Sequence, residues 1–223
     1  MAATLTQLRT RVRRMADMED SNFVSDTELN DYINSSYSEL YDLLVSSNSE
    51  YFLSSTTSTV VSGSSTIALP TDFYKLRAVD FYLNGRWYDI EQFSMNERNQ
   101  DSTLYSSAGV EVRYRLQGST LKLIPSDNAG GQYQIWYIPL PTTLSADSDE
   151  IEEGNGWSEL VVVDAAIKCL MKEESSTTEL MKIKSDLTKR VVDLAAKRDS
   201  GKPKKIIDSG NRFSYDSYRR YRR

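Results

Sequence analysis

Apolar residues recur every three or four positions near the start of the chain. The first set predicts a short amphipathic helix with arginines on its solvated face, and its members are Leu5, Leu8, Val12 and Met15. The second set predicts a helix of about four turns, and its members are Leu29, Tyr32, Ile33, Tyr37, Leu40, Tyr41 and Leu44. Just before it, Ser25-Asp-Thr-Glu28 has the form of a capping box, in which the Ser25 and Glu28 side chains bond the first backbone amides reciprocally.

Helical spacing returns in the last third of the chain. One set predicts a largely buried helix, and its members are Trp157, Leu160, Val161, Asp164, Ala165, Ile167, Lys168 and Met171. A narrower set predicts a long charged helix that ends near Gly201, and its members are Leu180, Ile183, Leu187, Val191 and Leu194. Neither terminal pair of helices covers its own apolar stripe, so we expect the two pairs to pack as one bundle.

Between Tyr51 and about Leu144 the pattern changes to strand-length runs broken by turn signals. Asn84-Gly85 is the clearest turn, between the runs 76–83 and 87–90, and predicts a two-residue hairpin. The other expected strands are residues 56–61 and 66–69, around a Ser-Gly turn, and 110–116, 120–124 and 133–138. We expect the last three to form a meander, and residues 94–100 to form a single helical turn. Together these runs predict a small antiparallel sheet or barrel of roughly five to seven strands.

The expected fold class is therefore α+β, a helical bundle formed by N- and C-terminal helices with an inserted small antiparallel β domain and an extended C-terminal tail. The corresponding boundaries are 1–50 and 146–200 for the two parts of the bundle, 51–145 for the β domain and 201–223 for the tail.

The amino-acid composition disfavours several kinds of catalytic and metal-binding site. The chain has no histidine and one cysteine, Cys169, so it lacks the commonest general base and metal ligand and cannot form an internal disulfide. We therefore expect no enzyme activity, no catalytic residue, no cofactor and no metal. No run reaches the roughly 18 apolar residues of a membrane span, and the start of the chain lacks the apolar core of a signal peptide, so we expect no membrane partner.

Several polar groups have a functional and a structural interpretation. The acidic stretch Asp147, Asp149, Glu150, Glu152 and Glu153 does not have the residue order of a calcium loop, and a solvated loop, open to a basic patch of a neighbour, is favoured. Lys168 is either a lysine of lowered pKa or one that extends to the helix edge. Cys169 is best explained as a small core residue. The arginines at 9, 11, 13 and 14 either grip phosphates or form a solvated face, and the second is favoured.

The charge is unevenly distributed. The whole chain has a net charge of -5, but residues 201–223 hold eight basic and two acidic residues, a net charge of +6, which leaves -11 for residues 1–200. A basic tail on an acidic body is typical of a tail that binds an acidic partner. Arginine and tyrosine are enriched in this tail, and both are common at protein interface hot spots and on nucleic acid. The even spacing of three tyrosines favours docking in a protein groove.

Five stretches, in order along the chain, resemble head-to-tail adaptor (connector) proteins of tailed bacteriophages. They are residues 23–34 (FVSDTELNDYIN), 68–75 (ALPTDFYK), 118–125 (GSTLKLIP), 133–139 (YQIWYIP) and 195–199 (AAKRD). The similarity covers about residues 4–200 and depends on order and spacing, because each motif alone is weak.

The resemblance implies a structural protein of the virion neck, assembled in the host cytoplasm as a ring, usually of twelve copies, between the portal protein and the tail or nozzle proteins. Genomic DNA would pass through the channel of the ring without sequence-specific binding, and the acidic body is consistent with a wall along which DNA slides. The C-terminal tail would anchor each copy to the portal, through Arg212, Phe213, Tyr215, Tyr218, Arg219, Arg220, Tyr221, Arg222 and Arg223.

Two other functions stay open at this point. The basic tail could hold nucleic acid, in which case the affinity falls steeply with salt. A carboxylate-dependent cell-wall hydrolase is the weaker alternative, because no pair of carboxylates stands out as acid and base.

Overall fold

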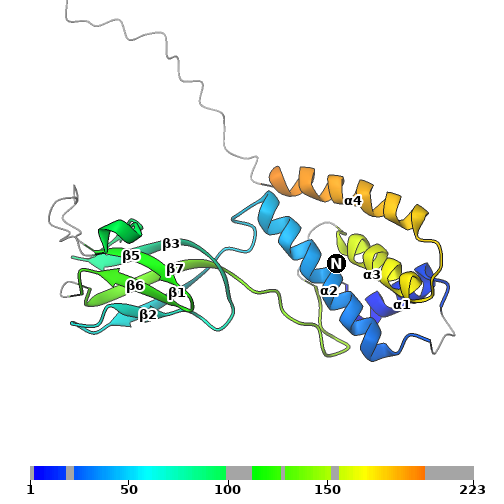
Figure 1. The fold of residues 1–223 in the computed structure, drawn as a ribbon, viewed down its shortest axis with the longest axis horizontal. Coiled ribbons are helices and arrows are strands. Elements are labelled where there is room, and N and C mark those ends of the chain that lie inside the picture. Colours follow the sequence, from blue (N-terminus) through cyan, green and yellow to red (C-terminus); the bar gives the residue numbers. More distant parts are fainter. Residues whose placement is uncertain (1–2, 19–22, 99–111, 127–128, 152–155, 199–223) are drawn as a thin grey trace, which may run out of the picture.

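A computed structural model describes residues 3–18, 23–98, 112–126, 129–151 and 156–198. The fold is α+β. Its helices and its strands lie at opposite ends of the long axis of the molecule, and we call them the helical part and the β part (Figure 1). Each part has its own cluster of buried apolar side chains.

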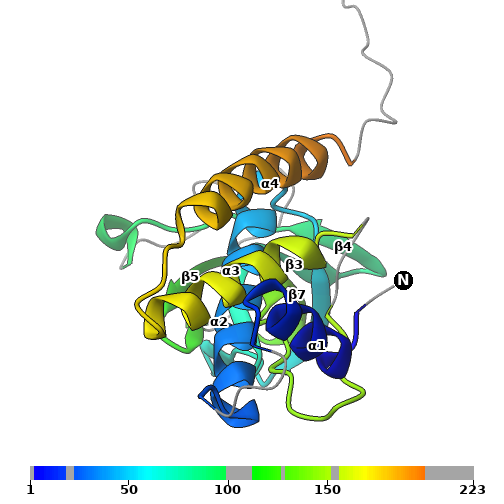
Figure 2. The ribbon, with the colours of Figure 1, turned by 90° about the vertical axis from the view of Figure 1, so that its right-hand side faces the viewer.

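The helical part contains α1 (Leu5–Met15), α2 (Asp26–Ser47), α3 (Ser158–Lys172) and α4 (Thr178–Ala196). The helix α3 is central and contacts each of the other three (Figure 2). This position explains its composition, because a helix surrounded by others buries apolar residues around most of its circumference. Val161, Val163 and Ala165 are fully buried, as are Leu8 on α1 and Ile33 on α2.

The N-terminal ends of α1 and α2 carry side-chain caps. The capping box predicted at Ser25 forms only in half, since the Ser25 hydroxyl accepts from the backbone N–H of Glu28 at 3.2 Å. The Glu28 carboxylate instead accepts from Tyr32 at 2.8 Å and from Lys172 on α3 at 2.6 Å. A complete capping box lies at the start of α1, between Thr4 and Gln7. Because Glu28 pairs with Lys172, its carboxylate does not complete the capping box at Ser25.

Four residues predicted in the apolar stripes are exposed, and they are Met15 at 36%, Ile183 at 44%, Leu194 at 38% and Met171 at 60%. The stripe of α4 is therefore narrower than its sequence indicates. The helix packs on the core through Leu180, Leu187, Val191 and Ala195, so its outer apolar residues face solvent in the single chain.

The β part contains two antiparallel sheets. The four-stranded sheet has the order β1-β7-β3-β4, with bounds Ser54–Val60, Gly131–Pro139, Phe73–Leu83 and Arg86–Asp89. The three-stranded sheet has the order β2-β6-β5, with bounds Thr66–Ala68, Thr120–Ile124 and Arg113–Gln117. One buried cluster takes side chains from both sheets, so the sheets pack face to face. A short 3-10 helix, η1 (Met95–Glu97), confirms the predicted helical turn.

The hairpin prediction is confirmed and the meander prediction is wrong. Asn84 and Gly85 both have positive φ, 50° and 83°, as the two-residue turn between β3 and β4 requires. The strands β5 and β6 pair as expected, but β7 lies between β1 and β3 in the other sheet. The inner face of β7 buries Tyr133, Ile135 and Tyr137, and a central position with two partners covers this apolar surface better than an edge beside β6. The strands β1 and β2, on either side of the Ser-Gly turn, also belong to different sheets.

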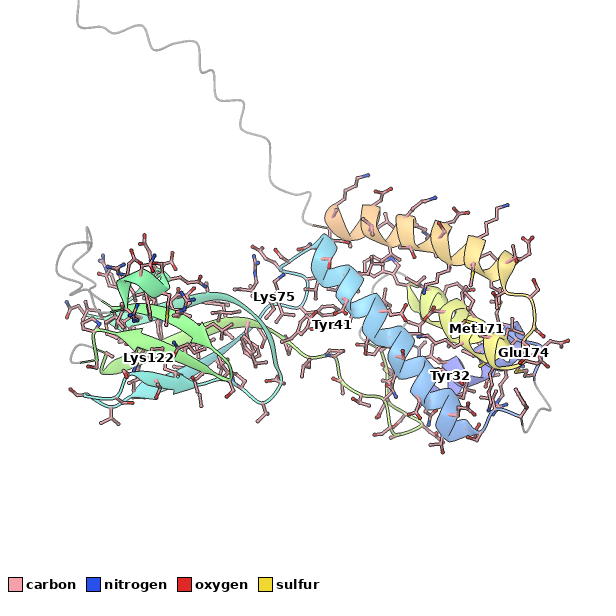
Figure 3. The ribbon with its side chains drawn as sticks, in the orientation of Figure 1. Tyr32, Tyr41, Lys75, Lys122, Met171 and Glu174 are labelled. Atoms are coloured by element: carbon pink, nitrogen blue, oxygen red, sulfur yellow. The ribbon has the colours of Figure 1, made fainter. Side chains whose placement is uncertain are left out.

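The two parts meet through a small apolar joint, whose members are Tyr41, Val45, Phe52 and Ile138. The Tyr41 ring stacks on Phe52 with centroids 4.3 Å apart, and its hydroxyl donates to the Pro139 carbonyl at 2.6 Å (Figure 3). The Tyr74 hydroxyl also donates to the Asp42 carboxylate at 2.8 Å. These contacts tie α2 to β7 and β3, and so hold the β part in one orientation on the helical part.

Candidate assembly surfaces

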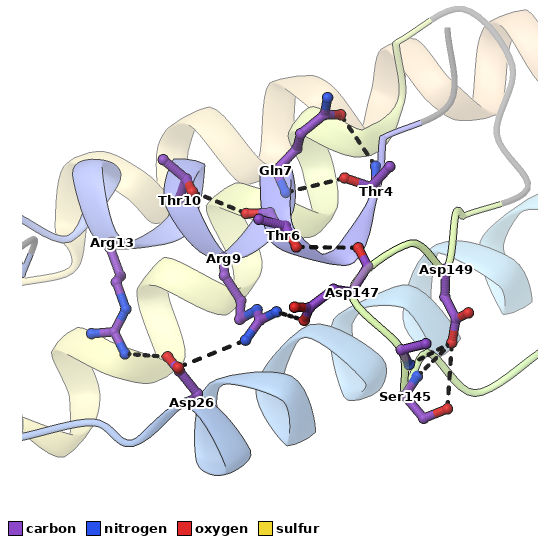
Figure 4. A network of polar contacts seen from close by, with 11 residues as sticks. Thr4, Thr6, Gln7, Arg9, Thr10, Arg13, Asp26, Ser145, Asp147 and Asp149 are labelled. Atoms are coloured by element: carbon purple, nitrogen blue, oxygen red, sulfur yellow. Dashed lines mark hydrogen bonds and ion pairs between the residues drawn. The ribbon is translucent and has the colours of Figure 1, made fainter.

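The arginines of α1 bind carboxylates of their own chain. Arg9 pairs with Asp147 and lies 3.7 Å from Asp26, and Arg13 donates to Asp26 at 2.8 Å (Figure 4). Arg11 pairs with Glu159 on α3. The hydrogen bond and charge of Arg13, together with the charge of Arg9, lower the pKa of the Asp26 carboxyl. The favoured interpretation of Arg9 and Arg13 as a solvated face is wrong, because these two side chains are only 16% and 19% exposed.

The acidic stretch is a structural support for α1. The backbone N–H groups of Leu5 and Thr6 donate to the carbonyls of Asp149 and Asp147. The Asp149 carboxylate accepts from the backbone of Ser145 and Ala146, both at 2.8 Å, and these bonds lower its pKa. The described part of this stretch is therefore used within the chain, while Glu152 and Glu153 lie outside the described residues. Among the described residues, no group of three or more acidic or cysteine side chains is arranged to hold a metal.

A charge network joins α2, α3 and α4. Asp164 on α3 is 4% exposed and lies at its centre. Lys168 and Lys184 approach the two oxygens of Asp164 at 2.8 and 2.5 Å, and Glu39 on α2 lies 2.9 and 3.0 Å from the same two ammonium groups. Lys168, for which the sequence left two interpretations, is thus an ion-pair partner in the helical part.

Burial and ion pairing shift the pKa values of this network in opposite directions. Burial by itself raises the pKa of Asp164, but hydrogen bonds from Lys168, Lys184 and Ser36 outweigh it and hold the pKa below its ordinary value. Burial likewise acts to lower the pKa of Lys184, but Asp164 and Glu39 hold it above its ordinary value. Asp164 and Lys184 therefore stay charged around neutral pH.

A groove of about 670 Å³ opens beside this network, between α3 and α4. Met171 and Met181 line it and are 60% and 51% exposed. Methionine side chains adapt to the shape of a partner, so the groove is a candidate contact surface of the helical part.

The outer face of the four-stranded sheet carries aromatic and acidic side chains, and we call it the acidic face. Tyr82 and Trp87 lie opposite one another on β3 and β4, with ring centroids 4.9 Å apart and 38% and 41% of their surface exposed. In the next row of the same face, Asp80 lies directly opposite Asp89. The Asp80 carboxylate accepts from the indole N–H of Trp136 on β7 at 2.7 Å.

Apart from Lys75 and Ile138, the remaining paired positions of the acidic face are uncharged, and they are Ser55, Thr57, Thr59, Ala78, Gln132 and Gln134. Lys75 lies opposite Ile138 where this face reaches the joint, and no lysine or arginine stands at its other paired positions. The face therefore presents aromatic surface and negative charge together.

The outer face of the three-stranded sheet has the opposite sign, and we call it the basic face. Arg115 on β5 lies directly opposite Lys122 on β6, and Arg113 lies two residues before Arg115 on the same side (Figure 3 labels Lys122). Arg115 and Lys122 are partly exposed, whereas the Arg113 side chain is only 11% exposed. Arg113 lies 3.6 Å from Glu97 of η1, and Arg115 donates to the Phe93 carbonyl at 3.2 Å. No carboxylate stands at the paired positions of this face.

One further prediction concerns a single residue. Cys169 is 2% exposed, which confirms that it is a core residue, and burial raises the pKa of its thiol to about 11. No helix in the described part of the chain is long and apolar enough to cross a membrane. The nine tail residues expected to bind the portal lie outside the described residues, so that site stays a prediction.

Comparison with protein families identifies the chain. The family model described as SU10 adaptor protein matches residues 3–201, which include both the helical part and the β part. The chain belongs to the SU10 adaptor protein family. This adaptor is thus a structural protein of a tailed bacteriophage, in agreement with the resemblance found in the sequence. No curated protein matches it. The family match ends at residue 201 and so carries no information on the tail.

The sequence did not reveal the two charged faces of the adaptor. Asp80 and Asp89 are nine positions apart, and Arg115 and Lys122 are seven apart, and each pair meets only across a hairpin turn. The signals that were available are the turns at Asn84-Gly85 and Gly118-Ser119, which set the registers that place Asp80 opposite Asp89 and Arg115 opposite Lys122.

Proposed function

We propose that the protein forms the adaptor ring between the portal and the tail of a phage, as twelve copies in the virion neck. The helices are then the bundle that builds the ring, and the strands are a domain inserted into it. The channel continues that of the portal, and genomic DNA passes through it without sequence-specific binding. The match of the adaptor family to both parts of the chain carries this proposal.

In this proposal the C-terminal tail anchors each copy to the portal. The last nine residues hold four arginines and three tyrosines, which supply charge-assisted hydrogen bonds and large contact area to a protein partner. The tail follows α4, whose end lies beside the joint, because Asn48 donates to the Ala195 carbonyl at 3.4 Å and Arg198 lies 3.9 Å above the Tyr51 ring. Several arms bound at once gain affinity through their high effective concentration.

Deletion of residues 211–223 tests the anchor. We expect the truncated protein to keep its helical and β content and to lose binding to purified portal by at least about a hundredfold, since a ring loses every arm together. Affinity is measured by sedimentation with the portal, and folding by circular dichroism. Undiminished portal binding by the truncated protein would show that the tail is not the anchor.

A tail that binds nucleic acid is the second candidate, because its composition also suits phosphate contacts. Titration of the full chain with duplex DNA at several salt concentrations separates the two functions. A tail gripping DNA gives an affinity that falls by orders of magnitude between about 50 and 200 mM salt. We expect no such binding at physiological salt, and portal binding instead.

A further inference from the structure

We propose that neighbouring copies in the ring contact one another through the β part, with the acidic face of one copy against the basic face of the next. This inference rests on the proposed ring and adds the surface that joins its copies. It starts from two pairs of residues, Asp80 with Asp89 and Arg115 with Lys122.

Each pair is unfavourable within a single chain. Like charges directly opposite one another on adjacent strands repel and destabilise a sheet. The β part holds one such pair on each outer face, and the two pairs have opposite signs. Contact between an acidic face and a basic face replaces both repulsions with attraction, which makes a second copy the partner that fits both surfaces.

The aromatic residues of the acidic face add to this fit. Tyr82 and Trp87 are two-fifths exposed and lie one row from Asp80 and Asp89. A guanidinium group binds a carboxylate and stacks on an aromatic ring, and both contacts gain strength when water is excluded. Arg115 of a neighbouring copy therefore finds both kinds of partner on one face.

The placement of the two faces selects a ring over a dimer. They are the two outer faces of a pair of packed sheets, so one copy can use both at once with different neighbours. Such a head-to-tail contact closes into a ring when the rotation per copy divides a full turn and there is no translation along the ring axis. Two acidic faces or two basic faces would repel, which disfavours a symmetric dimer. The joint at Tyr41 and Phe52 holds the β part on the helical part, so the helical parts of neighbouring copies are related by the same rotation as their β parts.

Charge reversal on each face gives a direct test. One variant carries Asp80→Lys and Asp89→Lys, and a second carries Arg115→Glu and Lys122→Glu. Ring assembly on purified portal is followed by mass photometry at about 0.1 M salt, where exposed charges are only partly screened. We expect each variant alone to need at least about tenfold more protein than wild type, since every contact then joins like charges.

Mixing the two variants supplies the control for folding. Every contact between alternating copies then joins opposite charges, so an equimolar mixture should assemble at nearly the wild-type concentration. Assembly of either variant alone at wild-type concentration, or failure of the mixture while both variants keep the wild-type circular dichroism spectrum, would overturn the face-to-face contact. The proposed adaptor function would survive both results, whereas a wild-type protein that never joins the portal would remove the function and the inference together.

A cross-link identifies the partner surface. A chain with Asp89→Cys and Lys122→Cys, assembled on portal and treated with a short bis-maleimide, should give a ladder of linked copies, and the two single variants should not. Cys169 contributes little background because it is buried and its thiol has a pKa of about 11. Links between two copies of position 89 would show a different occupant of the acidic face.

Discussion

The helical part and the β part differ in how their charged side chains are paired. In the helical part, acidic groups such as Asp164, Asp26 and Glu28 each lie beside a lysine or arginine of another helix. In the β part, Asp80 faces Asp89 and Arg115 faces Lys122. The first arrangement completes a fold within one chain. The second places like charges opposite one another on each outer face, which fits the proposed contact between copies.

The largest effect is expected from the network in the helical part. Asp164→Ala removes a buried carboxylate that holds two lysines, and we expect it to lower the free energy of unfolding by about 3 kcal/mol, measured by urea denaturation. Asp186→Ala is the matched control, because Asp186 and Lys189 are 3.7 Å apart and both more than 70% exposed. It should leave the unfolding curve unchanged. Equal losses from the two changes would contradict the central place of Asp164.

The effect of Asp164→Ala on the free energy of unfolding is expected to depend on pH. Because the folded pKa of Asp164 lies below its ordinary value of 3.8, its contribution is fully present above that value and is lost as the pH falls through the folded pKa. The difference in stability between wild type and Asp164→Ala should therefore shrink in acid. Lys184 works in the other direction, since its contribution is present below 10.5 and is lost as the pH rises through its raised folded pKa.

A smaller effect is expected at the joint between the two parts. Tyr41→Phe keeps the stack on Phe52 but removes the donor to the Pro139 carbonyl, and we expect a loss of about 1–2 kcal/mol. Hydrogen exchange should rise around residues 48–53 and 139–144, while the cores of both parts keep their protection. A uniform rise across the chain would mean that Tyr41 supports one cooperative fold and not a joint.

The smallest effect has the opposite sign. Asp89→Asn removes the repulsion with Asp80, and we expect the isolated protein to gain a few tenths of a kcal/mol, about 0.3, in thermal or urea unfolding. The same change should weaken assembly on the portal. A variant that is less stable alone would contradict the view that this pair costs stability in the single chain.

The sequence predicted the helices well because their apolar spacing is local. The start of α2 at Ser25 and the turn at Asn84-Gly85 were also predicted, since each depends on a few adjacent residues. The position of β7 was not predicted, because the choice of partners depends on residues that are far apart in the chain.

The arginines of α1 were misjudged for the same reason. Their partners, Asp26, Asp147 and Glu159, come from three other segments. The exposure of Met171 and Ile183 was not predicted either, because the spacing of apolar residues shows which side of a helix is buried but not how much of its circumference. The family could be recognised from the order of short motifs, while the charged faces became visible only once the strand register was known.

Cryo-electron microscopy of the full chain bound to purified portal tests the central claim most directly. The account predicts a closed ring on the portal in which the β strands of each copy place Asp80 and Asp89 against Arg115 and Lys122 of the next. A portal without bound copies would contradict the adaptor function. A closed ring whose acidic and basic faces both point to solvent would contradict the way in which its copies are joined.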